Sequence, residues 1–107
     1  MLGFAPRAVG GWWAEAGGEI DVVALGEHEA LLGECKWSSH PVGVDVLDAL
    51  IRKGEAFRRD EDIRRGGAPR LRYAIFSRSG FSPEFLARAA AEGVLAHDLA
   101  ELERGNP

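Results

Sequence analysis

The sequence predicts an α/β domain in which helices flank a mixed central sheet. Two neighbouring apolar segments joined by a short turn, Glu19–Leu25 and Ala30–Trp37, have the composition of paired strands. Apolar residues then recur with a helical period across Val42–Arg59, and Ser82 followed by Pro83 is a typical helix start. A chain of 107 residues has room for one core, so we expect these elements to pack into a single domain.

Three strands open the predicted order. Arg7–Trp13 has the pattern of a first strand, and the glycines at positions 10 and 11 indicate a bend or bulge within it. A glycine-rich turn over Ala14–Gly18 leads into Glu19–Leu25. The next connection, Gly26–Glu29, is short and turn-like, which favours an antiparallel hairpin with Ala30–Trp37. We expect this hairpin to lie at the centre of the sheet.

A helix is predicted over Val42–Arg59, after Pro41 interrupts the strand. Its apolar stripe comprises Val44, Leu47, Leu50, Ile51, Gly54 and Phe57. We expect this helix to cover the sheet face that bears Cys35 and Trp37, or the opposite face if the register differs by one residue.

The remaining elements alternate between strand and helix. In order, they are a loop over Arg64–Arg70, a mostly buried strand over Leu71–Ser77, a helix capped by Ser82 that stops at Gly93, a short strand over Val94–Ala96, and a last helix from Asp98 through Glu103.

The composition favours a soluble cytoplasmic protein. Hydrophobic residues make up 46% and charged residues 28% of the chain, and no apolar run approaches the roughly 20 residues needed to span a bilayer. The first residues lack the pattern of a signal peptide. The single cysteine, Cys35, excludes an internal disulfide and fits a reducing compartment, where we expect a structural thiol rather than a nucleophile.

The net charge of −4 is unusual for a free-standing nucleic-acid binder, because phosphate contacts supply most non-specific affinity. Basic residues are concentrated between Arg52 and Arg72. This segment is either a solvated helix end followed by a loop, or a surface that binds DNA. An acidic domain can still act on nucleic acid if a partner module holds the substrate.

Acidic and basic side chains gather at one level of the hairpin. Because side chains of a strand alternate between faces, Glu19 and Asp21 share one face, and Glu34 and Lys36 share one face of the next strand. Carboxylate oxygens suit Mg²⁺, and a lysine beside a metal-bound water can stabilise developing negative charge. The alternative is the solvated face of a half-exposed hairpin, with weak cross-strand ion pairs.

Two resemblances favour the site. Asp21 followed by Glu34-Cys35-Lys36 resembles the PD-(D/E)XK signature of restriction endonucleases and Holliday-junction resolvases. Further blocks resemble the uncharacterised C-terminal domain of archaeal-type P-loop ATPases, a family placed in the same superfamily. These blocks are Val9-Gly10-Gly11-Trp12-Trp13, Glu19-Ile20-Asp21-Val22-Val23-Ala24, Gly33-Glu34-Cys35-Lys36-Trp37-Ser38, Phe76-Ser77-Arg78-Ser79-Gly80-Phe81 and Gly93-Val94 to Leu99.

The resemblance implies a restriction-endonuclease-like fold and a site for Mg²⁺ or Mn²⁺. Asp21, Glu34 and the backbone carbonyl of Cys35 would hold the metal, and Lys36 would orient the attacking water. Glu19 is a further ligand or an exposed acid at the strand start.

The first core helix of the superfamily is missing here, so we expect residues 1–107 to be a fragment or the C-terminal module of a larger ATPase, in cis or in trans. The sheet face left uncovered suggests a homodimer or another partner. DNA is the expected substrate, for endonuclease or exonuclease action. The alternative is a non-catalytic interaction or regulatory domain that retains the nuclease fold.

Other residues near the motif allow two interpretations each. Trp12, Trp13 and Trp37 can stack on unpaired bases, but tryptophans beside a short core more often pack within it. Ser77 and Arg78 can contact phosphate or hydrogen-bond within their own loop. The chain has no phosphate-binding loop for ATP.

Overall fold

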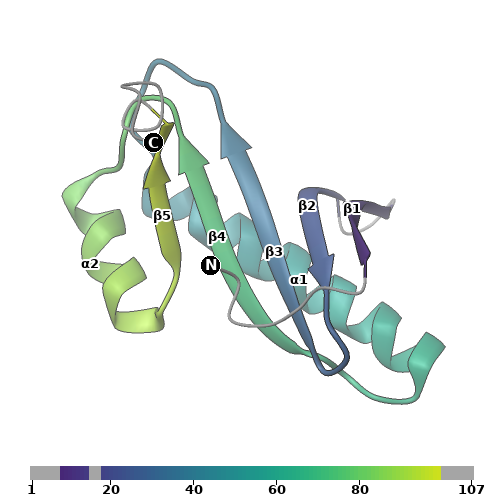
Figure 1. The fold of residues 1–107 in the computed structure, drawn as a ribbon. Helices are drawn as coiled ribbons and strands as arrows, with labels where there is room; N and C mark the ends of the chain where they lie inside the picture. Colours follow the sequence, from purple (N-terminus) through teal and green to yellow (C-terminus); the bar gives the residue numbers. More distant parts are fainter. Residues whose placement is uncertain (1–7, 15–17, 100–107) are drawn as a thin grey trace, which may run out of the picture.

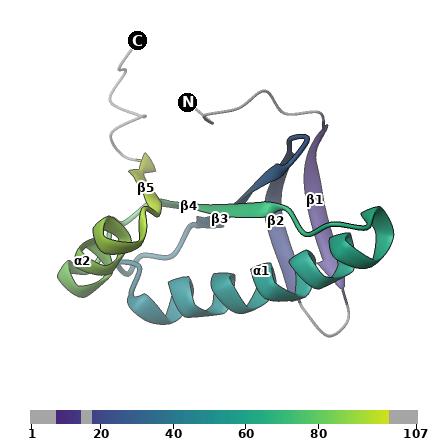
Figure 2. The same cartoon turned by 90° about the horizontal axis from the view of Figure 1, so that it is seen from below.

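The computed structural model describes residues 8–14 and 18–99, which form a mixed sheet with two helices on one side (Figures 1 and 2). Within these residues, the five strands lie in the order β1-β2-β3-β4-β5. The elements are β1 (Ala8–Ala14), β2 (Gly18–Leu25), β3 (Glu29–Lys36), α1 (Val44–Arg65), β4 (Arg70–Ser77), α2 (Pro83–Glu92) and β5 (Leu95–Asp98). The predicted α/β class is confirmed.

The three opening strands form an antiparallel meander, as the sequence predicts. β2 pairs with β3 from Leu25↔Ala30 to Val22↔Gly33, across a turn closed by Gly26 N–H donating to the Glu29 carbonyl at 2.7 Å. β1 pairs with β2, and their register shifts where the glycines of β1 lie. The successive pairs Gly10↔Val23 and Trp12↔Ile20 are two positions apart on β1 but three positions apart on β2. Strand β2 therefore carries the extra residue of the bulge.

The other half of the sheet is parallel. β3 pairs with β4 along its whole length, and β4 pairs with β5. Parallel neighbours need a crossover connection, which α1 and α2 provide. The carboxyl ends of β3, β4 and β5 therefore lie at one edge of the sheet (Figure 1).

Helix α1 runs six residues beyond the predicted end at Arg59, to Arg65. The charged segment after Phe57 contains neither Gly nor Pro before Gly66, and Arg64 pairs with Asp60 one turn back at 3.3 Å. The helix ends where Gly66 adopts a left-handed conformation with φ 72° and its N–H bonds the Asp62 carbonyl.

The core lies between the sheet and the two helices. It is built from Ile20, Val23, Ala30, Leu32, Val42, Leu47, Leu50, Phe57, Ile75, Phe85 and Ala89. Helix α1 packs on the face that bears Leu32 and Glu34, because Lys53 of α1 reaches the Glu34 carboxylate. The first expectation, that α1 covers the face of Cys35 and Trp37, is wrong, and the opposite face is the covered one.

The packing expected for Trp37 is also wrong. Its residue surface is 64% exposed, and it lies just beyond Lys36, the last residue of β3. The side chains of Trp12 and Trp13 lie outside the described part of the structure.

The second half of the chain largely follows the prediction. The Ser82 hydroxyl accepts a hydrogen bond from the Phe85 N–H at 3.1 Å, Pro83 opens α2, and Gly93 ends it at φ 71°. The last strand is Leu95–Asp98, slightly beyond the predicted Val94–Ala96.

Some predictions lie outside the described residues. These are the turn across residues 15–17 and the final helix across residues 100–103. The expected lack of a helix before the first strand likewise refers to residues 1–7. No helix within the described ranges is long and apolar enough to cross a membrane.

Gly54 permits the close approach of α1 to β4. A methyl group placed on Gly54 would overlap the hydroxyl and ring of Tyr73, whereas nothing lies within 4 Å of one placed on Gly67. We expect Gly54→Ala to lower the free energy of unfolding by about 1–3 kcal/mol, despite the higher helix propensity of alanine. Urea unfolding measures this, with Gly67→Ala as the control. A Gly54→Ala variant as stable as wild type would contradict this account of the helix position.

Candidate functional site

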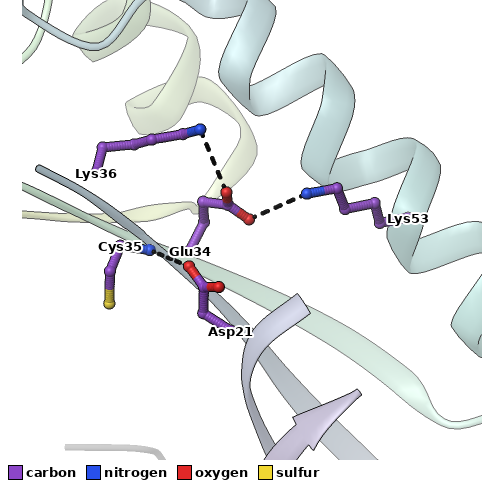
Figure 3. A network of polar contacts seen from close by, with 5 residues as sticks. All are labelled: Asp21, Glu34, Cys35, Lys36 and Lys53. Carbon is purple, nitrogen blue, oxygen red and sulfur yellow. Dashed lines mark hydrogen bonds and ion pairs between the residues drawn. The ribbon is translucent and has the colours of Figure 1, made fainter. Parts of the chain in front are cut away.

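The candidate site begins where β2 leaves β3. The last described pair of this ladder is Val22↔Gly33, two residues short of Cys35. Beyond it, the Cys35 backbone N–H donates to Asp21 Oδ2 at 2.9 Å (Figure 3). The exposed Asp21 carboxylate thus satisfies an N–H group that the strand ladder no longer pairs. The extra residue of β2 lies at this level of the strand and gives the divergence its physical cause.

Glu34 is the buried acid of the site. It is 7% exposed, and its two carboxylate oxygens face two different lysines (Figure 3). Lys36 Nζ lies 3.4 Å from Oε2, and Lys53 Nζ of α1 lies 3.4 Å from Oε1. We call these three residues the Lys–Glu–Lys cluster.

Burial explains why one carboxylate has two cationic neighbours. Removing a carboxylate from water costs several kcal/mol unless opposite charges and hydrogen bonds compensate. The side chains of Lys36 and Lys53 stay 39% and 24% exposed, so water still reaches both ammonium groups. The cluster carries a net charge of +1, and the Asp21 carboxylate beside it brings the total to zero.

The predicted residues Asp21, Glu34 and Lys36 come together at one end of the hairpin. In Figure 3, Asp21 and Glu34 lie next to the Cys35 backbone, one contributed by β2 and the other by β3. Glu19 is exposed near the start of β2. Among residues 8–14 and 18–99, no three His, Cys, Asp or Glu side chains form a group able to hold a metal ion.

Cys35 presents its backbone, rather than its thiol, to the acids. Its sulfur points away from Glu34 (Figure 3), and its side chain is partly buried. Burial raises the pKa of the Cys35 thiol above its ordinary value, and the negative charges of Asp21 and Glu34 raise it further. The thiol therefore stays protonated at neutral pH, in agreement with the structural role that the sequence suggests.

Lys53 is the site residue that sequence reasoning missed. It lies in the basic stretch, whose other members on α1, such as Arg52 and Arg58, are exposed. Its position was nevertheless readable, because Lys53 lies three residues after Leu50 and four before Phe57, and both of these are buried. A lysine on the buried stripe of a helix needs an acidic partner, which Glu34 supplies.

The polar residues that follow β3 and β4, and His97 of β5, have different surroundings. Ser77 is buried, and its hydroxyl donates to the Gly80 carbonyl at 2.7 Å, so it holds its own loop. Arg78 and His40 are exposed. His97 stacks on Phe76 with ring centroids 5.4 Å apart, away from the acids of the site.

The raised pKa of Cys35 makes its alkylation sensitive to pH. Iodoacetamide reacts with the thiolate. We therefore expect the alkylation rate of Cys35 to rise at a higher pH than the rate for an unperturbed cysteine thiol. Asp21→Asn removes one negative charge while retaining an oxygen acceptor for the Cys35 N–H, and should move the midpoint of the rate profile to lower pH. Glu84→Gln, on the distant α2, should leave the midpoint unchanged. An unshifted midpoint in Asp21→Asn would disprove the electrostatic contact.

One family model matches part of the chain. It is described as archaea bacterial proteins of unknown function (DUF234), and it covers residues 1–50 of the 107, a segment that contains Asp21, Glu34 and Lys36. No curated protein and no solved structure matches the chain. The chain is thus similar, over slightly less than half its length, to proteins whose function is not assigned.

Proposed function

We propose that this is a metal-dependent, nuclease-like domain that acts on DNA phosphodiesters and normally works attached to a P-loop ATPase. The observation that carries the proposal is the meeting of Asp21, Glu34 and Lys36 at the point where β2 leaves β3. Two acids and a lysine at one strand divergence supply the oxygen ligands and the cation that phosphodiester hydrolysis requires.

The donor set fits a hard divalent cation in its chemistry. Asp21 and Glu34 offer carboxylate oxygens and Cys35 offers a backbone carbonyl, and these are the ligands preferred by Mg²⁺ and Mn²⁺. When bound, such an ion polarises a phosphoryl oxygen and lowers the pKa of a coordinated water. Since both Glu34 oxygens face lysines at 3.4 Å, a cation that binds Glu34 competes electrostatically with two ammonium groups.

The residues of the chain then have separate roles. Asp21 and Glu34 would hold the metal ion beside the substrate phosphate. Lys36 would donate hydrogen bonds to the attacking water and to the phosphoryl oxygens as negative charge develops. Lys53 offsets the charge of the buried Glu34 carboxylate before metal and substrate arrive.

The fold assignment within this proposal rests on topology and resemblance. An antiparallel meander followed by a helix and a parallel strand is the arrangement expected of a restriction-endonuclease-like core, with α1 as the crossover. The attachment to an ATPase domain, in cis or in trans, follows from the resemblance and agrees with the net charge of −4, because an acidic domain benefits from a partner that holds the DNA. A homodimer and a cytoplasmic location stay predictions.

A second function has one observation in its favour. The Lys–Glu–Lys cluster neutralises Glu34 without a metal, so the buried acid has partners in the protein itself. A non-catalytic interaction or regulatory domain that retains the nuclease fold would keep such a cluster for stability alone.

A cleavage assay separates the two functions. Wild-type protein is incubated with supercoiled plasmid, single-stranded DNA and branched DNA in Mg²⁺, Mn²⁺ or EDTA. We expect cleavage in either metal and none in EDTA. Asp21→Asn, Glu34→Gln and Lys36→Met should each lower the rate by about 100-fold or more, because each removes a ligand or a charge that stabilises the transition state.

The control variant for this assay is Glu84→Gln, which changes an exposed acid in the first turn of α2 and should cleave like wild type. A wild-type protein that cuts none of the substrates, in any metal, would reject the nuclease proposal. Equal cleavage by Asp21→Asn and wild type would reject the site and point to a contaminating enzyme.

A further inference from the structure

The edge of the sheet beside Lys36 carries an exposed tryptophan in a fixed position. Trp37 follows β3 and Arg78 follows β4, and these strands are parallel neighbours in register from Glu29↔Arg70 to Lys36↔Ser77. The Arg78 N–H donates to the Lys36 carbonyl at 2.9 Å. The backbones that carry the Trp37 and Arg78 side chains therefore lie side by side at the carboxyl ends of the parallel strands.

The loop that follows Trp37 is hydrogen-bonded to the loop that follows Arg78. The Ser79 hydroxyl donates to the Ser38 carbonyl at 2.6 Å. Val42 and Phe81 form a parallel bridge, with the Val42 N–H bonded to the Gly80 carbonyl and the Ser82 N–H bonded to the Val42 carbonyl. These contacts hold the chain on both sides of Trp37, so binding at this edge would order little additional backbone.

Trp37 presents an aromatic surface to solvent. At 64% exposed, it leaves a large apolar ring accessible for stacking at the protein surface. Among the described residues, the other large hydrophobic side chains that are exposed are aliphatic, Ile63 and Leu86, on the helices.

The charges at this edge complement an anion. Lys36 is half-exposed, and Arg78 and His40 are exposed. The acids near these groups are Glu34, which pairs with Lys36, and Asp98 at the end of β5, whose carboxylate lies beside Gly80. An aromatic surface flanked by cations is the combination that binds single-stranded nucleic acid, in which unpaired bases stack on rings and phosphates contact basic groups.

We propose that this edge binds single-stranded nucleic acid, with one unpaired base stacked on Trp37 and an adjacent phosphate against Arg78. A duplex cannot bind in this way, because its base faces are already stacked within the helix. This places the strand next to Lys36, so the inference names the substrate class of the proposed nuclease site and rests on that function for the position of the cut. The binding itself does not require cleavage.

The test measures binding without cleavage. Fluorescein-labelled oligonucleotides, a 12-nucleotide single strand of DNA or RNA and a fully paired 12-base-pair duplex without a loop, are titrated with the full chain in EDTA and followed by anisotropy. We expect wild type to bind the single strands at least about tenfold more tightly than the duplex. Stacking on an aromatic side chain is worth about 1–3 kcal/mol per base, so Trp37→Ala should weaken single-strand binding by about 5- to 150-fold.

The accompanying variants separate stacking from charge and folding. Trp37→Phe should keep most of the affinity, since a ring remains. Arg78→Gln should weaken binding and make its salt dependence shallower, because one phosphate contact is lost. Ile63→Ala truncates an exposed apolar side chain near the far end of α1 and should bind like wild type. The melting temperature of each variant confirms that it folds.

The outcomes are distinct for the two proposals. Binding of single strands that depends on Trp37 supports this inference even if no DNA is ever cut, in which case the nuclease proposal fails alone. Equal affinity for duplex and single strand, unchanged binding by Trp37→Ala, or no binding by folded wild type would each overturn it. A difference between the DNA and RNA strands identifies which nucleic acid the edge prefers.

Discussion

The separation of β2 from β3 is the constraint on which the candidate site depends. The extra residue of β2 interrupts its register with β1, and the ladder to β3 is described no further than Val22↔Gly33. A continued ladder would engage the Cys35 N–H with backbone. Because the strands diverge, that N–H is instead satisfied by the Asp21 carboxylate, which is thereby held beside Glu34. One inserted residue thus brings acids from two strands to the same point.

The second determinant is the depth to which α1 packs on the sheet. Gly54 lets the helix approach Tyr73, and at that separation Lys53 reaches the buried Glu34 at 3.4 Å. The helix therefore contributes a cation to the site as well as apolar cover for the core. The balance of two lysines against two carboxylates explains how the buried acid is tolerated in the protein alone, and it means that a metal ion at this point must compete with an ammonium group.

The sequence predicts the local features well and the long-range ones less well. Backbone chemistry explains the hairpin, the irregularity at the glycines of β1 and both ends of α2. Ser82 and Gly93, for example, are residue types that begin and end helices. The sheet face that α1 covers cannot be predicted in this way. Leu31 and Leu32 point to opposite faces of β3 and both are apolar, so the alternation does not indicate which face is covered. The exposure of Trp37 is open for the same reason, whereas the position of Lys53 on the buried stripe of α1 is readable from its spacing to Leu50 and Phe57.

Calorimetric titration with Mn²⁺ tests the central claim, that Asp21 and Glu34 bind a metal ion in competition with the lysines. We expect wild type to bind, Glu34→Gln to bind at least about tenfold more weakly, and Lys53→Met to bind up to about fivefold more tightly, because a partly exposed ion pair worth up to about 1 kcal/mol no longer competes. Absence of binding to wild type, or equal affinity of wild type and Glu34→Gln, would contradict the account and leave the cluster as a structural ion pair.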